Sequence, residues 1–300
     1  MLPNFLIIGA AKSGTTAIYT YIKQHPDIFM SPKKELRYFS NIDPQPKAVP
    51  KQYIHESVST LEEYEHYFDT VTHEKIIGES SPTYLYKPGT AENIKSHIPN
   101  VKLLAILRNP VDRAYSAYTH ALREWKEPAK SFEEGLALET QRINAGWGML
   151  WHYINAGLYH KQLLRYYQCF KASQIKVVLH DDLVKGPDKL LEDLFIFLDV
   201  DPNFRPDISS RPNVSGFPKN EWFDNFLRTL FLEDNFLKRI SQGLFNTSFR
   251  KKITTKIRKA NLEKRAMPLE LRKQLAEIFS EDIHDLEKLI NRDLSHWLLG

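Results

Sequence analysis

The stretch that most constrains this chain is residues 4–24, where an apolar run, a glycine-containing turn and a helical pattern follow one another. The apolar run, Phe5–Ile8, has the composition of a strand that is buried on both faces of a parallel sheet. Gly9 and Gly14 bracket the turn, and apolar residues then recur at helical spacing until Pro26. This order aims backbone N–H groups and the positive end of a helix at one point, as phosphate binding requires.

The turn differs from the loop of ordinary nucleotide triphosphatases in the position of its lysine. Gly9 and Gly14 have the spacing of G-x-x-x-x-G-K-[ST], and Thr16 fills the final Ser/Thr position. Thr15 stands where the lysine is expected, and the lysine comes earlier, at Lys12. We therefore predict a phosphate-binding loop that is not an ordinary triphosphatase loop.

Short apolar strands alternate with helical patterns along the rest of the chain. Further strands are predicted at Lys75–Gly78, Val101–Leu107 and Ile175–Leu179, whereas His25–Ser40 is interpreted as a loop because prolines interrupt it. Such alternation is typical of an α/β fold with a mostly parallel sheet of the P-loop type, flanked by helices on both faces.

Helical patterns fill the segments between these strands. They are predicted at residues 61–68, 90–97, 110–125, 132–143, 158–170, 187–198 and 222–257, and from Pro268 onward. A chain of 300 residues is expected to form a single domain. Its core would cover about residues 1–200, and a nucleotide loop and a helical C-terminal region would follow over about 201–300.

Polar residues that suit an anion follow the predicted strands. Arg108 ends one strand, and Ser116 lies in the helix after it. A fork-shaped cation and a hydroxyl donor suit a phosphate, although an arginine at a strand end is more often part of a structural ion pair. Because Gly9–Thr16, Glu79 and Arg108 all follow parallel strands, we expect them along one edge of the sheet, where ligands bind in such folds.

A charged segment follows the first helix. Lys33, Lys34 and Arg37 surround Glu35 in the sequence. A carboxylate among cations stays ionised, and it can take a proton from a substrate hydroxyl that is placed against it. Glu35 is therefore a candidate general base, and the alternative interpretation is a solvated charge cluster without a chemical role.

Composition and charge limit the compartment and the partners. The single cysteine, Cys169, excludes an internal disulfide, and no apolar stretch approaches membrane-spanning length, so a cytoplasmic protein is expected. The net charge of +4 favours anionic ligands without indicating nucleic acid. The segment Arg250–Arg265 is rich in Lys and Arg, which favours a solvated helix face over a platform for a polyanionic acceptor or a membrane surface.

No sequence pattern for a metal site is present. His180–Asp182 is an acidic cluster at a strand end, where a Mg²⁺ site and a helix cap are the alternatives, and the cap is favoured.

Together these motifs resemble those of the sulfotransferases that use 3′-phosphoadenosine 5′-phosphosulfate (PAPS). Lys12-Ser13-Gly14-Thr15-Thr16 is similar to their loop for the 5′-phosphosulfate, and LRNPVDRAYSAY, residues 107–118, is similar to their 3′-phosphate motif. The resemblance implies that the loop binds the phosphosulfate and that Arg108 and Ser116 bind the 3′-phosphate.

The resemblance extends nearly from end to end. KKELRYF, residues 33–39, resembles the K-E-x-x-x-F segment of heparan sulfate sulfotransferases, which implies that Glu35 is the base. Similarity around Gly157-Leu158-Tyr159 and a loose match of RPNVSGFPK to a late nucleotide loop imply donor contacts from Tyr159, Arg211 and Lys219. Where glycosaminoglycan enzymes often have E-K-[ST]-x-x-Y, this chain has Glu79-Ser80-Ser81, so the acceptor stays open.

The resemblance implies a sulfotransferase that moves a sulfuryl group from PAPS to a hydroxyl or amine and releases 3′-phosphoadenosine 5′-phosphate (PAP). Lys12 and Glu35 would be the catalytic residues, with Glu79 or His120 as alternative bases, and no metal would be required. The acceptor would be a glycan, a lipid or a small hydroxyl or amine compound. The alternatives are a P-loop kinase-like phosphotransferase, which needs ATP and a Mg²⁺-holding acid, and a non-catalytic nucleotide- or polyanion-binding module.

Overall fold

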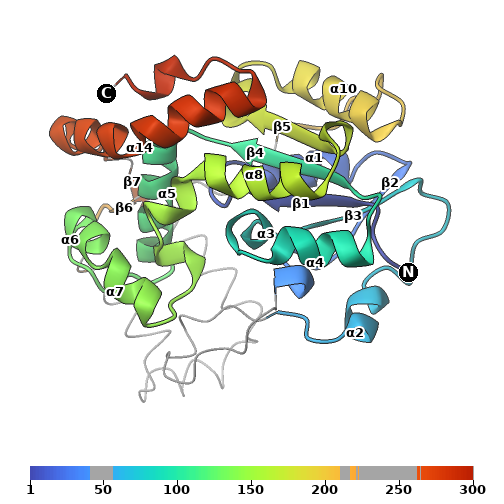
Figure 1. The fold of residues 1–300 in the computed structure, drawn as a ribbon, viewed down its shortest axis with the longest axis horizontal. Coiled ribbons are helices and arrows are strands. Elements are labelled where there is room, and N and C mark those ends of the chain that lie inside the picture. Colours follow the sequence, from blue (N-terminus) through green and yellow to red (C-terminus); the bar gives the residue numbers. More distant parts are fainter. Residues whose placement is uncertain (41–56, 210–216, 221, 223–261, 264, 300) are drawn as a thin grey trace.

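A parallel sheet forms the centre of the molecule (Figure 1). The computed structural model describes residues 1–40, 57–209, 217–220, 222, 262–263 and 265–299. Within these residues the sheet has five strands in the order β2-β3-β1-β4-β5, and every pair is parallel. The strands are β1 (Phe5–Gly9), β2 (Ile28–Met30), β3 (Ile76–Ser80), β4 (Lys102–Leu107) and β5 (Ile175–Leu179). A separate antiparallel ribbon pairs β6 (Phe217–Pro218) with β7 (Leu262–Glu263).

Helices lie on both faces of the sheet, and in Figure 1 α8 crosses in front of it. The described helices are α1 (Thr15–Ile22), α2 (Leu61–His66), α3 (Thr83–Tyr86), α4 (Thr90–His97), α5 (Pro110–Arg123), α6 (Phe132–Ala137), α7 (Glu139–Asn144), α8 (Tyr159–Cys169), α9 (His180–Lys185), α10 (Pro187–Leu198) and α14 (Leu269–Ile290). Short 3₁₀ turns lie at Tyr38–Ser40, Met149–Trp151, Asn155–Gly157, Ala172–Gln174 and Ser295–Trp297.

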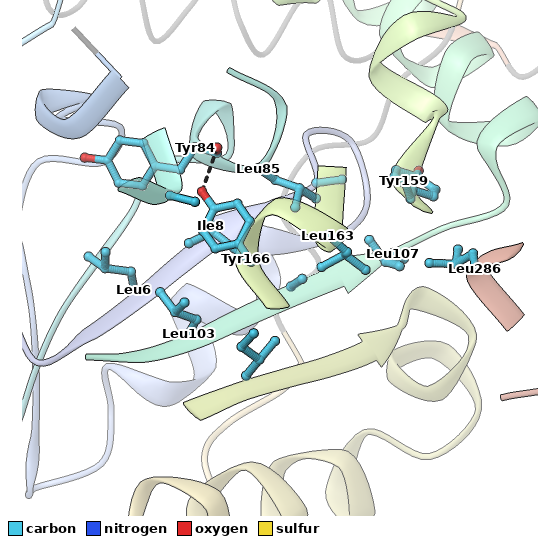
Figure 2. Close-up of a cluster of buried hydrophobic side chains, with 14 of the residues drawn as sticks. Leu6, Ile8, Tyr84, Leu85, Leu103, Leu107, Tyr159, Leu163, Tyr166 and Leu286 are labelled. Carbon is cyan, nitrogen blue, oxygen red and sulfur yellow. Dashed lines mark hydrogen bonds between the residues drawn. The ribbon is translucent and has the colours of Figure 1, made fainter. Parts of the chain in front are cut away.

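Strand side chains alternate between two buried apolar clusters, one on each face of the sheet. In β1, Leu6 and Ile8 join the cluster that includes residues of α4, α5, α8 and α14, whereas Phe5 and Ile7 join the cluster with α1 and α10. Figure 2 shows part of the first cluster. Because both faces of the sheet are covered, β1 is an uninterrupted apolar run. The predicted α/β fold with helices on both faces is confirmed.

Local sequence rules account for most element boundaries. The helix α5 begins at Pro110, as predicted, and the side chain of Asn109 caps it by accepting a hydrogen bond from the Val111 N–H at 2.9 Å. The last long helix, α14, follows Pro268 and runs to Ile290. The predicted strands at 5–8, 75–78, 101–107 and 175–179 correspond to β1, β3, β4 and β5.

Two predictions about local structure were wrong. The expected loop over His25–Ser40 contains β2, which pairs with β3 through Ile28 and Ile76. A three-residue edge strand is too short to show a period, and its partner is distant in the sequence. The expected helix over 132–143 is divided at Leu138 into α6 and α7. The pattern at 222–257 lies outside the described residues, apart from Trp222, and the single-domain organisation stays a prediction.

The strand order determines where a ligand can bind. After β1 the chain builds β2 and β3 on one side, then crosses β1 to build β4 and β5 on the other side. The carboxyl ends of β1 and β4 therefore meet at the point where the direction of winding reverses, which is the usual ligand crevice of such sheets. The loop before α1 and the start of α5 both leave the sheet there.

Candidate functional site

The loop between β1 and α1 forms part of the wall of a cavity of about 720 Å³. Gly14 precedes α1 with a φ of 111°, a left-handed conformation that glycine adopts readily, and no side chain caps the helix. Gly14, Thr15 and Thr16 line the cavity. The first N–H groups of a helix have no partner within the helix, so this uncapped start can receive an anion.

Lys12 lies within this loop and lines the same cavity. Burial lowers the pKa of its ammonium group to about 8, and the positive charges of Arg123 and Arg108 act in the same direction. Glu35 opposes this shift. A desolvated cation with a lowered pKa is poised to gain stability when an anion binds beside it.

A second place for an anion lies at the end of β4. Arg108 and Ser116 both line the cavity, one from the strand end and the other from α5. The guanidinium of Arg108 lies 3.5 Å from the carbonyl oxygen of Lys12, so the end of β4 contacts the loop before α1. The predicted meeting of the loop with Arg108 and Ser116 therefore occurs in the structure, while their role in binding stays a prediction.

The backbone around Arg108 is held by distant segments. The hydroxyl of Tyr159, from α8, donates to the Arg108 carbonyl oxygen at 3.0 Å, and Asn109 donates to the Trp297 carbonyl oxygen at 3.1 Å. Tyr159 is fully buried among the apolar side chains of Figure 2, and it does not line the cavity. Its hydroxyl supports the backbone of the arginine, while its contact with the donor stays a prediction.

Glu35 lines the cavity from a bent segment. Glu35 and Arg37 have φ values of 62° and 57°, and their side chains form an ion pair. The Glu35 N–H donates to the Ser80 carbonyl oxygen at 3.0 Å, and the Arg37 N–H donates to the Ser81 hydroxyl at 2.9 Å. Both charged side chains line the cavity, so the structure brings Glu35 together with Lys12 around one space.

The side chain of Glu79 supports this segment through the hydroxyl of Ser81. Its side chain is fully buried and accepts hydrogen bonds from the hydroxyls of Ser81 at 2.8 Å and Tyr64 at 3.3 Å. Burial raises the pKa of Glu79 to about 7, although these hydrogen bonds oppose the shift. Glu79 does not line the cavity, and it supports the segment of Glu35 through Ser81, while its role as an alternative base stays a prediction.

His120, the other alternative base, lines the cavity from α5. The guanidinium of Arg123 lies 2.9 Å from its Nδ1 atom. Because a guanidinium can only donate, Nδ1 must be the acceptor, and the neutral ring then carries its proton on Nε2. In this tautomer His120 is a hydrogen-bond donor, which suits a negatively charged oxygen better than it suits proton abstraction.

Two further predicted site residues, Ser13 and Lys219, are not part of the cavity wall. Ser13 is fully buried behind the loop, and Lys219 is exposed. Arg211 lies outside the described residues, as does most of the basic segment Arg250–Arg265. From that basic segment, however, Arg265 does line the cavity.

Sequence reasoning missed an aromatic and cationic wall. Arg265 lies over the ring of Phe217 at 5.4 Å, and that ring is 5.7 Å from Tyr115 on α5. All three residues line the cavity beside Ser116. Phe217 belongs to β6, and Arg265 follows β7, so the ribbon brings together residues that are far apart in the sequence. The sequence indications were the loose loop match RPNVSGFPK, which contains Phe217, and the basic segment that ends at Arg265, but neither predicted that the two residues meet.

The acidic cluster His180–Asp182 is engaged in structural contacts. Asp182 accepts a hydrogen bond from the Leu179 N–H at 3.0 Å at the start of α9, which confirms the predicted helix cap. Asp181 and Asp182 pair with His296 at 2.8 Å and Arg292 at 3.0 Å. Among the described residues, no group of three or more His, Cys, Asp or Glu could hold a metal ion. Within the same residues, no helix has the length and apolar character to cross a membrane.

Comparison with known proteins gives a consistent picture. The family model of the sulfotransferase domain matches residues 2–287. The crystal structure of a sulfotransferase from Alicyclobacillus acidocaldarius is 33% identical in sequence, covers 99% of both chains and superimposes with a TM-score of 0.75.

Two more distant relatives are longer than this chain. The membrane-associated sulfotransferase kil1 of Dictyostelium discoideum is 24% identical over 78% of this chain and 64% of its own length. The bifunctional heparan sulfate N-deacetylase/N-sulfotransferase 1 of Caenorhabditis briggsae is 29% identical over 68% of this chain and 23% of its own. The chain therefore spans less than two thirds of the length of each of these relatives.

Proposed function

The chain belongs to the sulfotransferase domain family and is a sulfotransferase, and from that premise we propose that it moves a sulfuryl group from PAPS to a hydroxyl or amine acceptor. The observation that carries this proposal is that two groups of residues suited to anions line one cavity. One is the uncapped start of α1 with Lys12, and the other is the pair Arg108 and Ser116.

This pair of positions fits a nucleotide with phosphates at both ends of its ribose. The 5′-phosphosulfate would lie against Gly14–Thr16 and Lys12, where helix N–H groups and a cation converge. The 3′-phosphate would take Arg108 and Ser116, which supply a fork-shaped cation and a hydroxyl. Arg265 and the Phe217 ring lie beside Ser116 and extend this binding wall. ATP has no 3′-phosphate, so a kinase would not need the second position.

The reaction requires one bond to break and one to form at sulfur. The acceptor oxygen or nitrogen attacks the sulfur atom, the bond from sulfur to the bridging oxygen breaks, and PAP leaves with the electron pair. We assign to Glu35 the proton that the acceptor loses. Lys12 would stabilise the negative charge on the leaving oxygen, and the Nε2–H of His120 would donate to charged oxygens as they develop.

The surroundings of Glu35 suit this assignment. Its ion pair with Arg37 orients the carboxylate, and both residues line the same cavity as the phosphate loop. The acceptor is a glycan, a lipid or a small hydroxyl or amine compound in this proposal, and the reaction needs no metal ion. We also propose that the protein is cytoplasmic and has no nucleic-acid partner.

A labelled-sulfate transfer screen tests the proposal. The protein would be incubated in EDTA with PAPS that carries radioactive sulfur, together with acceptors from each of the three classes. We expect transfer to one class, and loss of that transfer in the Lys12→Ala variant. Phosphate transfer from ATP in Mg²⁺ without sulfate transfer would favour the kinase-like alternative. PAP binding without transfer to any class would favour a non-catalytic binding module.

A further inference from the structure

One hydrogen bond connects two parts of the cavity wall. We call the segment with Glu35 and Arg37 the acceptor wall, and the loop before α1 together with Arg108 and Ser116 the donor wall. The ammonium group of Lys34 donates to the Thr16 hydroxyl oxygen at 2.8 Å. Lys34 immediately precedes Glu35 in the bent segment, and Thr16 lies in the first turn of α1 and lines the cavity. The bond therefore joins the residue next to the proposed base to the loop proposed to hold the phosphosulfate.

The two neighbouring lysines of this segment have different environments. Lys33 is exposed, and its ammonium group contacts the hydroxyl of Tyr67 at 3.3 Å on the molecular surface. Lys34 is partly buried and lies over the ring of Tyr19 at 5.6 Å. Burial lowers the pKa of Lys34, and the negative charges of Glu35 and Glu79 oppose this shift. A solvated charge cluster describes Lys33 but not Lys34.

The direction of the bond fixes what the Thr16 hydroxyl can do. An ammonium group has donors only, so the hydroxyl oxygen must be the acceptor of this bond. The proton of the hydroxyl is then left to donate in another direction, and Thr16 lines the cavity. With Lys34 in place, the hydroxyl oxygen accepts the bond from the ammonium group, and the hydroxyl proton can donate to an anion in the cavity.

We propose that Lys34 is a positioning residue that couples the two walls of the site. It orients the Thr16 hydroxyl toward the donor phosphate, and it holds the backbone before Glu35 at a fixed place relative to the phosphate loop. This inference rests on the proposed function, because the anion it refers to is the donor. Lys34 does not line the cavity, so it acts through Thr16 and Glu35 and not by contact with the substrate.

Calorimetric titration with PAP tests the coupling, with Lys33 as the matched control. Lys34→Met removes the ammonium group and keeps a side chain of similar length, and we expect PAP affinity to fall about three- to tenfold, the scale of one oriented hydrogen bond. Lys33→Met changes the same residue type one position earlier, and its PAP affinity should stay at the wild-type value. Thermal unfolding of both variants checks that they fold.

A double-mutant cycle with Thr16→Val separates positioning from general loosening of the site. If Lys34 acts through the Thr16 hydroxyl, Lys34→Met in the Thr16→Val background should change PAP affinity less than about twofold. The hold on Glu35 acts through the same bond, so Lys34→Met should lower kcat in the wild-type background and change it little in the Thr16→Val background. If Lys34→Met does not fold, Lys34→Gln takes its place in the same cycle, with the same expected and contradicting results.

Three outcomes would overturn the inference. Wild-type affinity in Lys34→Met, or an equal loss in Lys34→Met and Lys33→Met, would show that the bond does not position the site. Additive losses with Thr16→Val would show that Lys34 does not act through the hydroxyl. If the wild-type protein itself fails to bind PAP, the proposed donor is wrong and the inference fails with it. This result can be told apart from the others because it appears before any substitution.

Discussion

The donor and acceptor walls of the cavity are built in different ways. The donor wall consists of the ends of regular elements: Gly14 and Thr15 start α1, and Arg108 follows β4. The acceptor wall is an irregular segment in which Glu35 and Arg37 have left-handed φ values and are held by bonds to Ser80 and Ser81. The ends of regular elements form the donor wall, with support from the side chains of Tyr159 and Asn109 around Arg108, whereas one backbone and one side-chain hydrogen bond hold the irregular acceptor segment. Substitutions in the two walls should therefore separate nucleotide binding from turnover.

The largest expected effect lies on the acceptor wall. Glu35→Gln keeps the shape of the side chain and removes its ability to accept a proton, so kcat should fall by about 10²–10⁴-fold. PAP affinity should be nearly unchanged, because the carboxylate belongs to the other wall. Steady-state kinetics with an acceptor from the transfer screen and calorimetry with PAP measure the two quantities. Near-full activity of this variant would place the base elsewhere.

The matching substitution on the donor wall is Arg108→Ala. Loss of a charged hydrogen bond to the 3′-phosphate should weaken PAP binding by about 1.5–3 kcal/mol. Adenosine 5′-phosphate has no 3′-phosphate and serves as the control ligand, whose affinity should stay the same. An equal loss for both nucleotides in calorimetric titrations would mean that Arg108 organises the whole site and does not bind the 3′-phosphate.

The lowered pKa of Lys12 predicts how donor binding depends on pH. With a pKa of about 8, Lys12 is charged below that pH and loses its proton as the pH rises through it. PAP binds the charged form better, so its affinity should fall above pH 8, approaching about tenfold per pH unit. Lys12→Arg, which stays charged, should flatten this dependence between pH 7.5 and 9.5 in calorimetric titrations. A wild-type affinity that stays constant over this range would contradict the assignment.

The smallest expected effect concerns the support of the acceptor segment. Ser81→Ala removes the acceptor of the Arg37 N–H and a donor to Glu79. We expect kcat to fall about three- to tenfold and PAP affinity to change little, since both lost hydrogen bonds lie on the acceptor side. Kinetics and calorimetry on the same preparation check this. A larger loss of PAP affinity than of kcat would show that the two walls are not separable.

The donor wall was also the part that sequence reasoning could predict. The spacing of Gly9 and Gly14, the early Lys12 and the position of Arg108 at a strand end are local features, and the ends of parallel strands share one edge. The structure brings Lys12, Gly14 and Arg108 to one cavity. Their meeting followed from the α/β pattern alone, because the fold positions the ends of its own elements.

The rest of the site depends on contacts that no local pattern shows. Phe217 and Arg265 meet through a ribbon whose strands are distant in the sequence. In the sequence, Glu79 looks like an exposed residue at a strand end. In the structure its side chain is buried and accepts hydrogen bonds from the hydroxyls of Ser81 and Tyr64. A hydrogen bond between distant segments leaves no period or spacing in the chain, so these roles became visible only in the structure.

Calorimetric titration of the wild-type protein in EDTA, with PAP and with adenosine 5′-phosphate, tests the central claim most directly. The account predicts that PAP binds without metal and at least about tenfold more tightly, because Arg108 and Ser116 form a second position that only its 3′-phosphate can fill. Equal affinities for the two nucleotides would contradict the claim that this cavity is built for a donor with phosphates at both ends of the ribose.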